Sequence, residues 1–166
     1  GIVFFNSTDD ASTIMDYCTV EYGGRDTHNS NIDCDAASPT IQNCTIRHSD
    51  GYGIYCDDNS APTLTNNTVS NNGIYPISLY CGILDNNVTG NTGSGNGTDA
   101  IEVRSGDITS NRTWVSQDLY FNVTEGTTYG VTNVQNSAIL TIEPGCLVKF
   151  DAHTAIHIGY FSAATL

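Results

Sequence analysis

The side chains best suited to chemistry are two pairs of aspartates, Asp33 with Asp35 and Asp57 with Asp58, which occupy similar places one repeat apart. Carboxylate oxygens are the ligands that Ca²⁺ prefers, so a weak Ca²⁺ site is the one cofactor that this pattern suggests. No basic residue recurs beside the aspartates to act as a general base. The alternative is that they are solvated turn residues, and we predict no catalytic residue and no obligatory cofactor.

Cysteine is the second residue type with chemical potential. Its count is even and no Cys-x-x-Cys pair occurs, which argues against zinc and favours disulfides formed in an oxidising compartment. The six residues are Cys18, Cys34, Cys44, Cys56, Cys81 and Cys146.

Asparagine offers a third kind of site, because Asn-x-Ser/Thr is the acceptor sequence for N-linked glycans. Seven such sequons occur, at Asn6, Asn43, Asn66, Asn87, Asn96, Asn111 and Asn122. Either they carry glycans in a secreted protein, or they arise by chance in a chain rich in Asn and Thr.

The net charge limits the possible partners. It is −13, from 18 acidic and 5 basic residues, and the basic residues are scattered singly. Nucleic-acid binding requires a cationic surface, so we expect no nucleic-acid partner. No apolar run approaches the roughly 18 residues that a membrane span needs. The chain opens on "GIVFF" without a basic flank, so we expect a mature or excised segment rather than a signal peptide.

Two short phrases recur along the chain and define its elements. "MDYCTV" returns as "IQNCTI", "LTNNTV" and "LDNNVT", beginning at Met15, Ile41, Leu64 and Leu84. A second phrase, of the type "GIYC", begins at residues 1, 31, 53, 76 and 100, in steps of 30, 22, 23 and 24 residues. The phrases alternate apolar and polar residues between polar turns, and helical periodicity is absent.

A period of 20–30 residues with strands and no helix predicts a solenoid in which each repeat forms one coil. Neighbouring coils then lie roughly 4.8 Å apart as parallel strands. Ile41 should lie over Met15 and Leu64 over Ile41, and Ile32, Ile54 and Ile77 should form another column. Asn43, Asn66 and Asn86 should form a ladder of side-chain amides at a turn.

These phrases resemble the right-handed parallel β-helix repeat family, whose solenoid fold is shared with pectate lyases. The laps "SPTIQNCTI" and "GYGIYC" are most similar to the extracellular surface-protein branch found in archaea and bacteria, and the resemblance covers residues 1 to about 110. It implies an all-β, right-handed parallel β-helix.

Stacked coils bring equivalent cysteines together. A separation of about 4.8 Å lies within the Cα range of disulfides, so we predict bridges Cys18–Cys44 and Cys34–Cys56. The alternative is columns of free, buried thiols. Cys81 and Cys146 are left to pair with each other or with a neighbouring molecule.

The second part of the chain differs from the first. We divide the chain into β-helix coils at residues 1–113 and a β-rich segment at residues 114–166. Within that segment "LTIEPGCLVKF" resembles the opening of a β-helix domain, which suggests stacking on a neighbouring unit.

Both ends read as uncapped strands, which invite pairing with further strands. We therefore expect a structural subunit of an extracellular filament, sheath or surface layer, assembled from head-to-tail copies, stapled by disulfides and N-glycosylated. The alternative is a polysaccharide-binding or polysaccharide-cleaving module of a larger surface protein. In that case the tyrosines Tyr52, Tyr55, Tyr75 and Tyr80 would form an outward face that contacts sugars. The alternative is that they pack against neighbouring coils or molecules.

Overall fold

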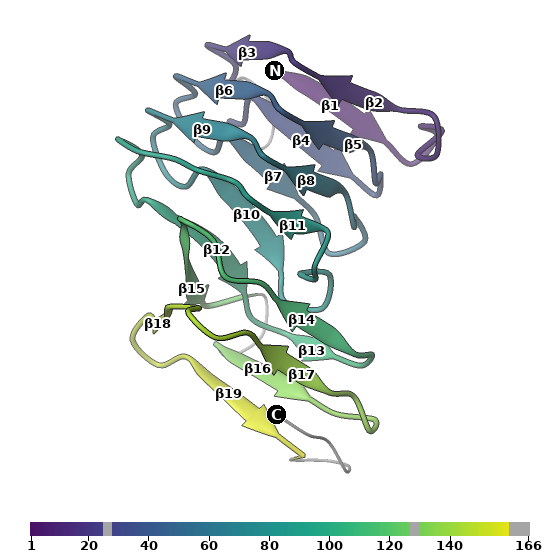
Figure 1. The fold of residues 1–166 in the computed structure, drawn as a ribbon, viewed down its shortest axis with the longest axis vertical. Helices are drawn as coiled ribbons and strands as arrows, with labels where there is room; N and C mark the ends of the chain where they lie inside the picture. The colour runs from purple at the N-terminus through teal and green to yellow at the C-terminus, as the bar shows by residue number, and fades with distance from the viewer. Residues whose placement is uncertain (25–27, 127–129, 160–166) are drawn as a thin grey trace.

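The chain winds into a parallel β-solenoid of about six turns. The structure is a computed structural model that describes residues 1–24, 28–126 and 130–159. Within these residues there is no helix, and every strand pair is parallel. Successive coils stack along the long axis, with β1 (Ile2–Phe5) and β19 (Ala155–Ile158) at opposite ends of the stack (Figure 1). The all-β solenoid predicted from the repeats is confirmed.

Five sheets form the sides of the stack. The widest follows the order β1 (Ile2–Phe5), β4 (Ile32–Asp35), β7 (Ile54–Cys56), β10 (Ile77–Tyr80), β12 (Ala100–Arg104), β15 (Tyr120–Thr124) and β18 (Val148–Phe150). A second contains β2 (Ile14–Asp16), β5 (Thr40–Gln42), β8 (Thr63–Thr65) and β11 (Val88–Thr89), and a third contains β3 (Thr19–Glu21), β6 (Thr45–Arg47) and β9 (Thr68–Ser70). A fourth sheet contains β13 (Asp107–Ile108), β16 (Val131–Val134) and β19 (Ala155–Ile158). The fifth sheet pairs β14 (Arg112–Trp114) with β17 (Leu140–Ile142).

Identical positions of successive coils lie directly over one another. One unbroken column inside the stack consists of Ile2, Ile32, Ile54, Ile77, Ile101, Phe121 and Val148. Met15, Ile41 and Leu64 form a second column. Both predicted columns are therefore confirmed. Because each side chain packs on its equivalent in the next coil, the apolar interior is continuous along the solenoid.

The chain turns the corner between the second and third sheets through a left-handed backbone conformation. Tyr17, Asn43 and Asn66 have φ values of 52°, 53° and 55°, and Gly90 follows in the next coil with φ 68°. Asparagine is several-fold enriched in this conformation and glycine adopts it freely. A Cβ atom at Gly90 would also lie 2.3 Å from Oδ1 of Asn66, so a larger residue there would displace the Asn66 side chain.

A buried polar ladder follows immediately after these corner residues. The backbone N–H of Cys44 donates to Oδ1 of Asn67 at 3.0 Å, and that of Asn67 donates to Oδ1 of Asn91 at 3.1 Å. The N–H of Asn91 donates in turn to Oε1 of Gln117 at 3.2 Å. Because an unpaired buried N–H is costly, this ladder allows the chain to bend inside the stack.

The corner after the third sheet repeats the same device. Oδ1 of Asn72 accepts from the backbone N–H of Ser49 at 3.0 Å, and Oδ1 of Asn96 accepts from the N–H of Asn72 at 3.1 Å. Ser49, Asn72 and Asn96 each follow a residue with left-handed backbone. These preceding residues, His48, Asn71 and Gly95, have φ values of 59°, 55° and 72°. Two columns of left-handed corners thus run along the stack, and in each column the backbone N–H of the buried residue after the corner donates to an asparagine or glutamine side chain of the next coil. These columns fix where each coil bends.

The amide ladder lies one residue later than the sequence predicts. Asn43 and Asn66 occupy equivalent positions, but they are the left-handed corner residues. The buried side-chain amides that form the ladder belong to Asn67 and Asn91. Asn86 is exposed in a turn and takes no part in the ladder. The fourth copy of the first phrase is also displaced, because Leu64 pairs with Val88 rather than with Leu84.

The seven-stranded sheet continues without a break across residue 113, from β12 through β15 to β18. The other sides of the coil change there, because β13 and β14 start new sheets. The division into residues 1–113 and 114–166 stays a prediction. In the part of the chain that the structure describes, no helix is long and apolar enough to cross a membrane.

Substitution of Asn67 by alanine should test the importance of the corner ladder. Asn67 is fully buried, and its amide also donates to the carbonyl of Ile41 at 2.9 Å. Asn67→Ala leaves buried partners unsatisfied and should lower the free energy of unfolding by about 3 kcal/mol. The exposed Asn86→Ala is the control and should change it by less than about 0.5 kcal/mol. Urea unfolding measures both, and equal effects would refute the ladder.

Candidate functional site

One face of the seven-stranded sheet carries a row of polar side chains. Because side chains alternate along a strand, the residues between the interior ones point outward. In register on this face lie Tyr55, Ser78, Glu102, Asn122 and Lys149, from five successive strands. The stacking therefore brings a phenol, a hydroxyl, a carboxylate, an amide and an amine into one line.

Two adjoining shallow depressions follow this row, and together they are called the furrow below. The larger has a volume of about 560 Å³ and is lined by Tyr75, Glu102, Thr124, Glu125, Asp151 and Ala152. The smaller has a volume of about 310 Å³ and is lined by Tyr55, Asp57, Asp58, Asn59, Arg104, Glu125 and Gly126. Glu125 lines both, so the furrow is continuous across several coils.

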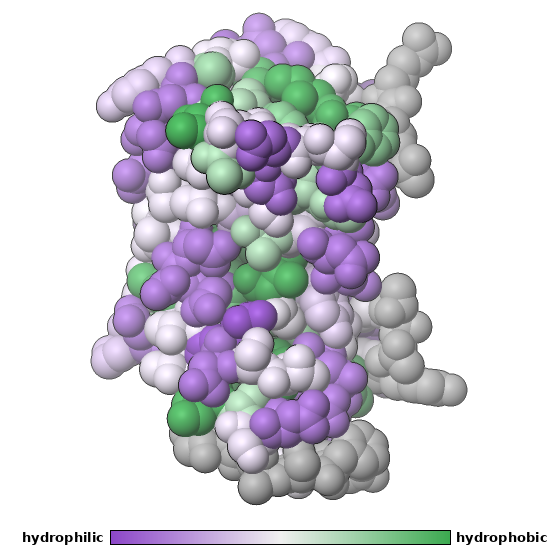
Figure 2. All heavy atoms as spheres, turned by 90° about the vertical axis from the view of Figure 1, so that its right-hand side faces the viewer, coloured by the Kyte–Doolittle hydropathy of each residue, from purple (hydrophilic) through white to green (hydrophobic). Residues whose placement is uncertain are grey.

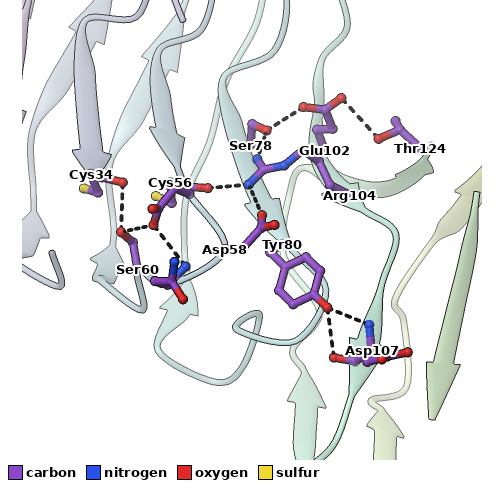
Figure 3. Close-up of polar contacts among 12 residues, drawn as sticks. Cys34, Cys56, Asp58, Ser60, Ser78, Tyr80, Glu102, Arg104, Asp107 and Thr124 are labelled. Atoms are coloured by element: carbon purple, nitrogen blue, oxygen red, sulfur yellow. Dashed lines mark hydrogen bonds and ion pairs between the residues drawn. The ribbon is translucent and has the colours of Figure 1, made fainter. Parts of the chain in front are cut away.

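Arg104 is the central cation of the furrow (Figure 3). Its guanidinium donates to Oγ of Ser78 at 2.6 Å, to the carbonyl of Cys56 at 2.6 Å and to Oδ1 of Asp58 at 3.2 Å. The side chain is only 12% exposed. The sequence-based view that no basic residue stands beside the aspartates is thus wrong for Asp58, because stacking brings Arg104 to it from 46 residues away.

Glu102 lies at the floor of the furrow and is only 8% exposed. The hydroxyl of Ser78 donates to Oε2 at 2.5 Å, and that of Thr124 donates to Oε1 at 3.2 Å. Through Ser78 this carboxylate is linked to Arg104, so charge and hydrogen bonds run along three neighbouring strands (Figure 3). Both carboxylate oxygens already accept a hydrogen bond, which suits Glu102 to hold the furrow in shape.

Two of the four tyrosines, Tyr55 and Tyr75, line the furrow. The ring of Tyr55 stacks on that of His28 at 3.7 Å between centroids, and the Arg104 guanidinium carbon lies 4.4 Å from its ring centre. Tyr52 meets Tyr55 edge-on at 5.2 Å. Burial, followed by the charge of Glu102, raises the pKa of Tyr52 to about 12. Tyr52 is therefore neutral at physiological pH and offers a hydrogen bond rather than a base.

Tyr75 and Tyr80 are held by the protein itself. The hydroxyl of Tyr75 accepts from Nδ2 of Asn122 at 2.9 Å, and that of Tyr80 accepts from the backbone N–H of Asp107 at 2.6 Å. Burial raises the pKa of both hydroxyls. These residues therefore pack against neighbouring coils, and their orientation is fixed.

The four aspartates proposed for Ca²⁺ do not share one site. Oδ2 of Asp33 lies 2.7 Å from Nδ1 of His28, and Asp58 pairs with Arg104. Oδ1 of Asp57 accepts from the hydroxyl of Ser60 at 2.6 Å, and Asp35 is exposed at the end of β4. Across residues 1–24, 28–126 and 130–159 no three His, Cys, Asp or Glu side chains converge as metal ligands.

The bridge predicted between Cys34 and Cys56 is not formed. The two residues are direct partners in neighbouring strands and both are fully buried, yet both are free thiols. In-register parallel strands direct the two Cβ–Sγ bonds side by side, whereas a disulfide needs sulfurs about 2.05 Å apart with a dihedral near 90°. The neighbouring Cys56 thiol, followed by burial, raises the pKa of Cys34 well above its usual value.

The bridge predicted between Cys18 and Cys44 is also not formed. The backbone N–H of Cys18 donates to Sγ of Cys44 at 3.4 Å, and each thiol donates to the carbonyl of the residue two positions before it. Cys81 and Cys146 are free and do not pair with each other. Burial raises the pKa of Cys81 to about 12, while the thiol of Cys146 donates to the carbonyl of Trp114 at 3.2 Å.

The seven sequons fall into two groups by exposure. The asparagines of three are exposed, namely Asn6, Asn66 and Asn111. Those of the other four are partly or fully buried, namely Asn43, Asn87, Asn96 and Asn122. Their occupation by glycans stays a prediction.

Sequence reasoning missed the two residues at the centre of the furrow. The alternation in "AIEVR" places Glu102 and Arg104 on one face of a strand, and this signal was available. No such signal pointed to the partners of Arg104, because Asp58 and Ser78 reach it only through the register of β7, β10 and β12.

Thiol titration should test the state of the cysteines. Unfolded protein purified without reductant should show six reactive thiols. Native protein should react rapidly at the exposed Cys18 and far more slowly at the buried Cys34, Cys56 and Cys81, because burial both blocks access and suppresses the thiolate. Mass spectrometry of the labelled peptides locates each thiol. Only two reactive thiols after unfolding would show that the bridges form.

Comparison with known proteins agrees with the coil architecture. No curated protein and no solved structure matches the chain. The family model described as "Right handed beta helix region" matches residues 1–143, which include the whole of the furrow except Asp151 and Ala152. This match covers most of the sequence, and the chain therefore belongs to the right-handed β-helix family.

Proposed function

We propose that the chain is a structural subunit of an extracellular filament, sheath or surface layer, in which copies stack head to tail and carry N-linked glycans. One observation carries this proposal. The interior columns of the solenoid reach both outermost strands of the seven-stranded sheet, so a second copy placed on either strand would continue them.

The first coil presents an apolar edge. Ile14 is 60% exposed and Phe5 is 58% exposed, and among the described residues no strand pairs with the outer edge of β1, β2 or β3. Figure 2 shows hydrophobic residues gathered at this end, whereas the side of the stack is largely hydrophilic. Isolated exposed apolar residues are common, but a cluster with unpaired backbone is a surface suited to association.

The last coil presents a matching edge. Within the described residues β18 is paired only with β15, and Leu147 and Phe150 are 53% and 49% exposed. If β1 of a second copy paired with β18, Ile2 would follow Val148 in the interior column. Such a contact joins two different surfaces and does not close on itself, so it generates a filament.

Charge sets a condition on this assembly. The net charge of −13 makes the copies repel one another, and salt screens this repulsion over about 8 Å at physiological ionic strength. Assembly should therefore be promoted by salt. The extracellular location is supported by the sequons and by the scarcity of charged residues, which make up 14% of the chain.

The furrow favours a second candidate function, which is binding of a polysaccharide. A long, open depression lined by hydroxyls, amides and fixed tyrosine rings suits a sugar chain. Cleavage is less well supported, since Arg104 already has three hydrogen-bond partners and is not free to act as a base. Calorimetric titration with neutral and acidic oligosaccharides tests binding, and absence of heat with both would exclude it.

A proline in the outer edge should block head-to-tail assembly. The N–H of Ile2 bonds to β4, so the N–H of Val3 points to the free side of β1. Val3→Pro removes the N–H that a second copy would use, while leaving the bonds to β4 in place. We expect sedimentation velocity in physiological salt to show filaments for the unmodified chain and monomers for Val3→Pro.

Val3→Thr is the matched control, because it alters the side chain and keeps the N–H. It should assemble like the parent. A parent chain that stays monomeric at high concentration in salt would contradict the proposal.

A further inference from the structure

The asparagines of the seven sequons differ in whether the fold leaves the side-chain amide nitrogen accessible or engages it in hydrogen bonds. We propose that the folded protein carries N-linked glycans at Asn6, Asn66 and Asn111, and at none of the other four sequons. This inference rests on the extracellular role proposed above. Exposure selects these three residues, and the hydrogen bonds donated by the other four amide nitrogens agree with that selection.

The chemistry of the modification explains why the amide nitrogen is decisive. Nδ2 of the asparagine forms a bond to C1 of a sugar, and the bond from C1 to the phosphate oxygen of a lipid-linked donor breaks. The phosphate leaves with the electron pair, and Nδ2 loses one of its two protons. A glycosylated asparagine therefore keeps only one N–H to donate, and its nitrogen must reach solvent.

Two sequons use both N–H groups inside the structure. Nδ2 of Asn96 donates to the carbonyl of Val69 at 3.0 Å and to Oδ1 of Asp99 at 2.9 Å. Nδ2 of Asn122 donates to the hydroxyl of Tyr75 at 2.9 Å and to Oδ1 of Asp151 at 3.1 Å. Attachment of a sugar necessarily breaks one bond in each pair. Asn122 is also only 6% exposed, so the sugar would have no room.

Two further sequons are held by one N–H each. Nδ2 of Asn87 donates to the carbonyl of Pro62 at 2.6 Å, and its Oδ1 is buried. Nδ2 of Asn43 donates to Oδ1 of Asp16 at 2.8 Å, and the residue is only partly exposed. In both cases the nitrogen is turned toward the preceding coil, and neither residue is among the exposed asparagines.

The remaining three sequons leave the nitrogen accessible. Asn111 uses its Oδ1 to accept the backbone N–H of Ile139 at 3.0 Å, a bond that glycosylation preserves. Asn66 is exposed at the left-handed corner between β8 and β9, and Asn6 is exposed in the turn after β1. All three asparagines lie outside every strand.

This distribution keeps the glycans away from the furrow. Asn122 is the one sequon asparagine on the furrow side of the seven-stranded sheet, and it is among the four that are excluded.

Glycopeptide mass spectrometry tests the proposal directly. The chain is secreted from a host that performs N-glycosylation, together with a known glycoprotein whose occupancy shows that the machinery is active. We expect glycans on peptides containing Asn6, Asn66 and Asn111 and unmodified peptides for the other four. Glycans on Asn96 or Asn122 in folded protein, or bare Asn6, Asn66 and Asn111 beside an occupied control protein, would overturn it.

A matched pair of variants separates modification from folding. Asn66→Asp should remove the mass of one glycan and leave the melting temperature unchanged, because aspartate also tolerates the left-handed conformation. Asn122→Asp should leave the glycan mass unchanged and lower the melting temperature by several degrees, because two buried donors are lost. Loss of glycan mass in Asn122→Asp would contradict the assignment. Occupancy is measured whether or not filaments form, so this result is independent of the assembly proposal.

Discussion

The structure depends on one constraint, which is that each coil must place its backbone in register with the coil beside it. The sheets meet this requirement through ordinary parallel ladders. The corners meet it through buried amides, in which Asn67, Asn91, Asn72 and Asn96 accept the backbone N–H groups of the coil before. If the register slipped by one residue, these amides would face apolar side chains and the interior columns would break.

The same constraint explains what can be predicted from the sequence. Apolar residues that recur with the repeat, such as Ile32, Ile54 and Ile77, stack as expected because the interior accepts only one register. The ladder was expected one residue too early, because sequence does not reveal which of two adjacent asparagines takes the left-handed backbone. Asn66 does so, and Asn67 points inward.

The predicted disulfides fail for a related reason. Repeat spacing predicts that Cys34 and Cys56 are neighbours, which is correct, but it carries no information on the direction of their side chains. The contacts that build the furrow could not be predicted from the sequence. Arg104 contacts residues from two earlier coils, and the number of residues in each intervening turn decides whether those contacts exist. Turn lengths vary between laps, so such a cluster follows only from the assembled stack.

The stacking of coils also creates the surfaces on which the functional proposals rest. The solenoid offers shallow lateral depressions, a side with exposed sequons and two end coils with unpaired strands. The ends are the most apolar of these surfaces, and they repeat the pattern by which coils already join within the chain. The furrow is rigid because its cation is fixed by Ser78, Asp58 and the carbonyl of Cys56. A rigid lateral face on a repeating scaffold would present the same ligand surface at regular intervals.

The central claim is that coil stacking continues from one copy to the next. Cryo-electron microscopy of the full chain at physiological salt, with helical reconstruction, tests it most directly. The account predicts filaments in which β1 of one copy lies parallel to β18 of its neighbour, at about the 4.8 Å spacing found within a sheet. Single particles with both end coils exposed to solvent, or filaments joined through the sides of the stack, would contradict it.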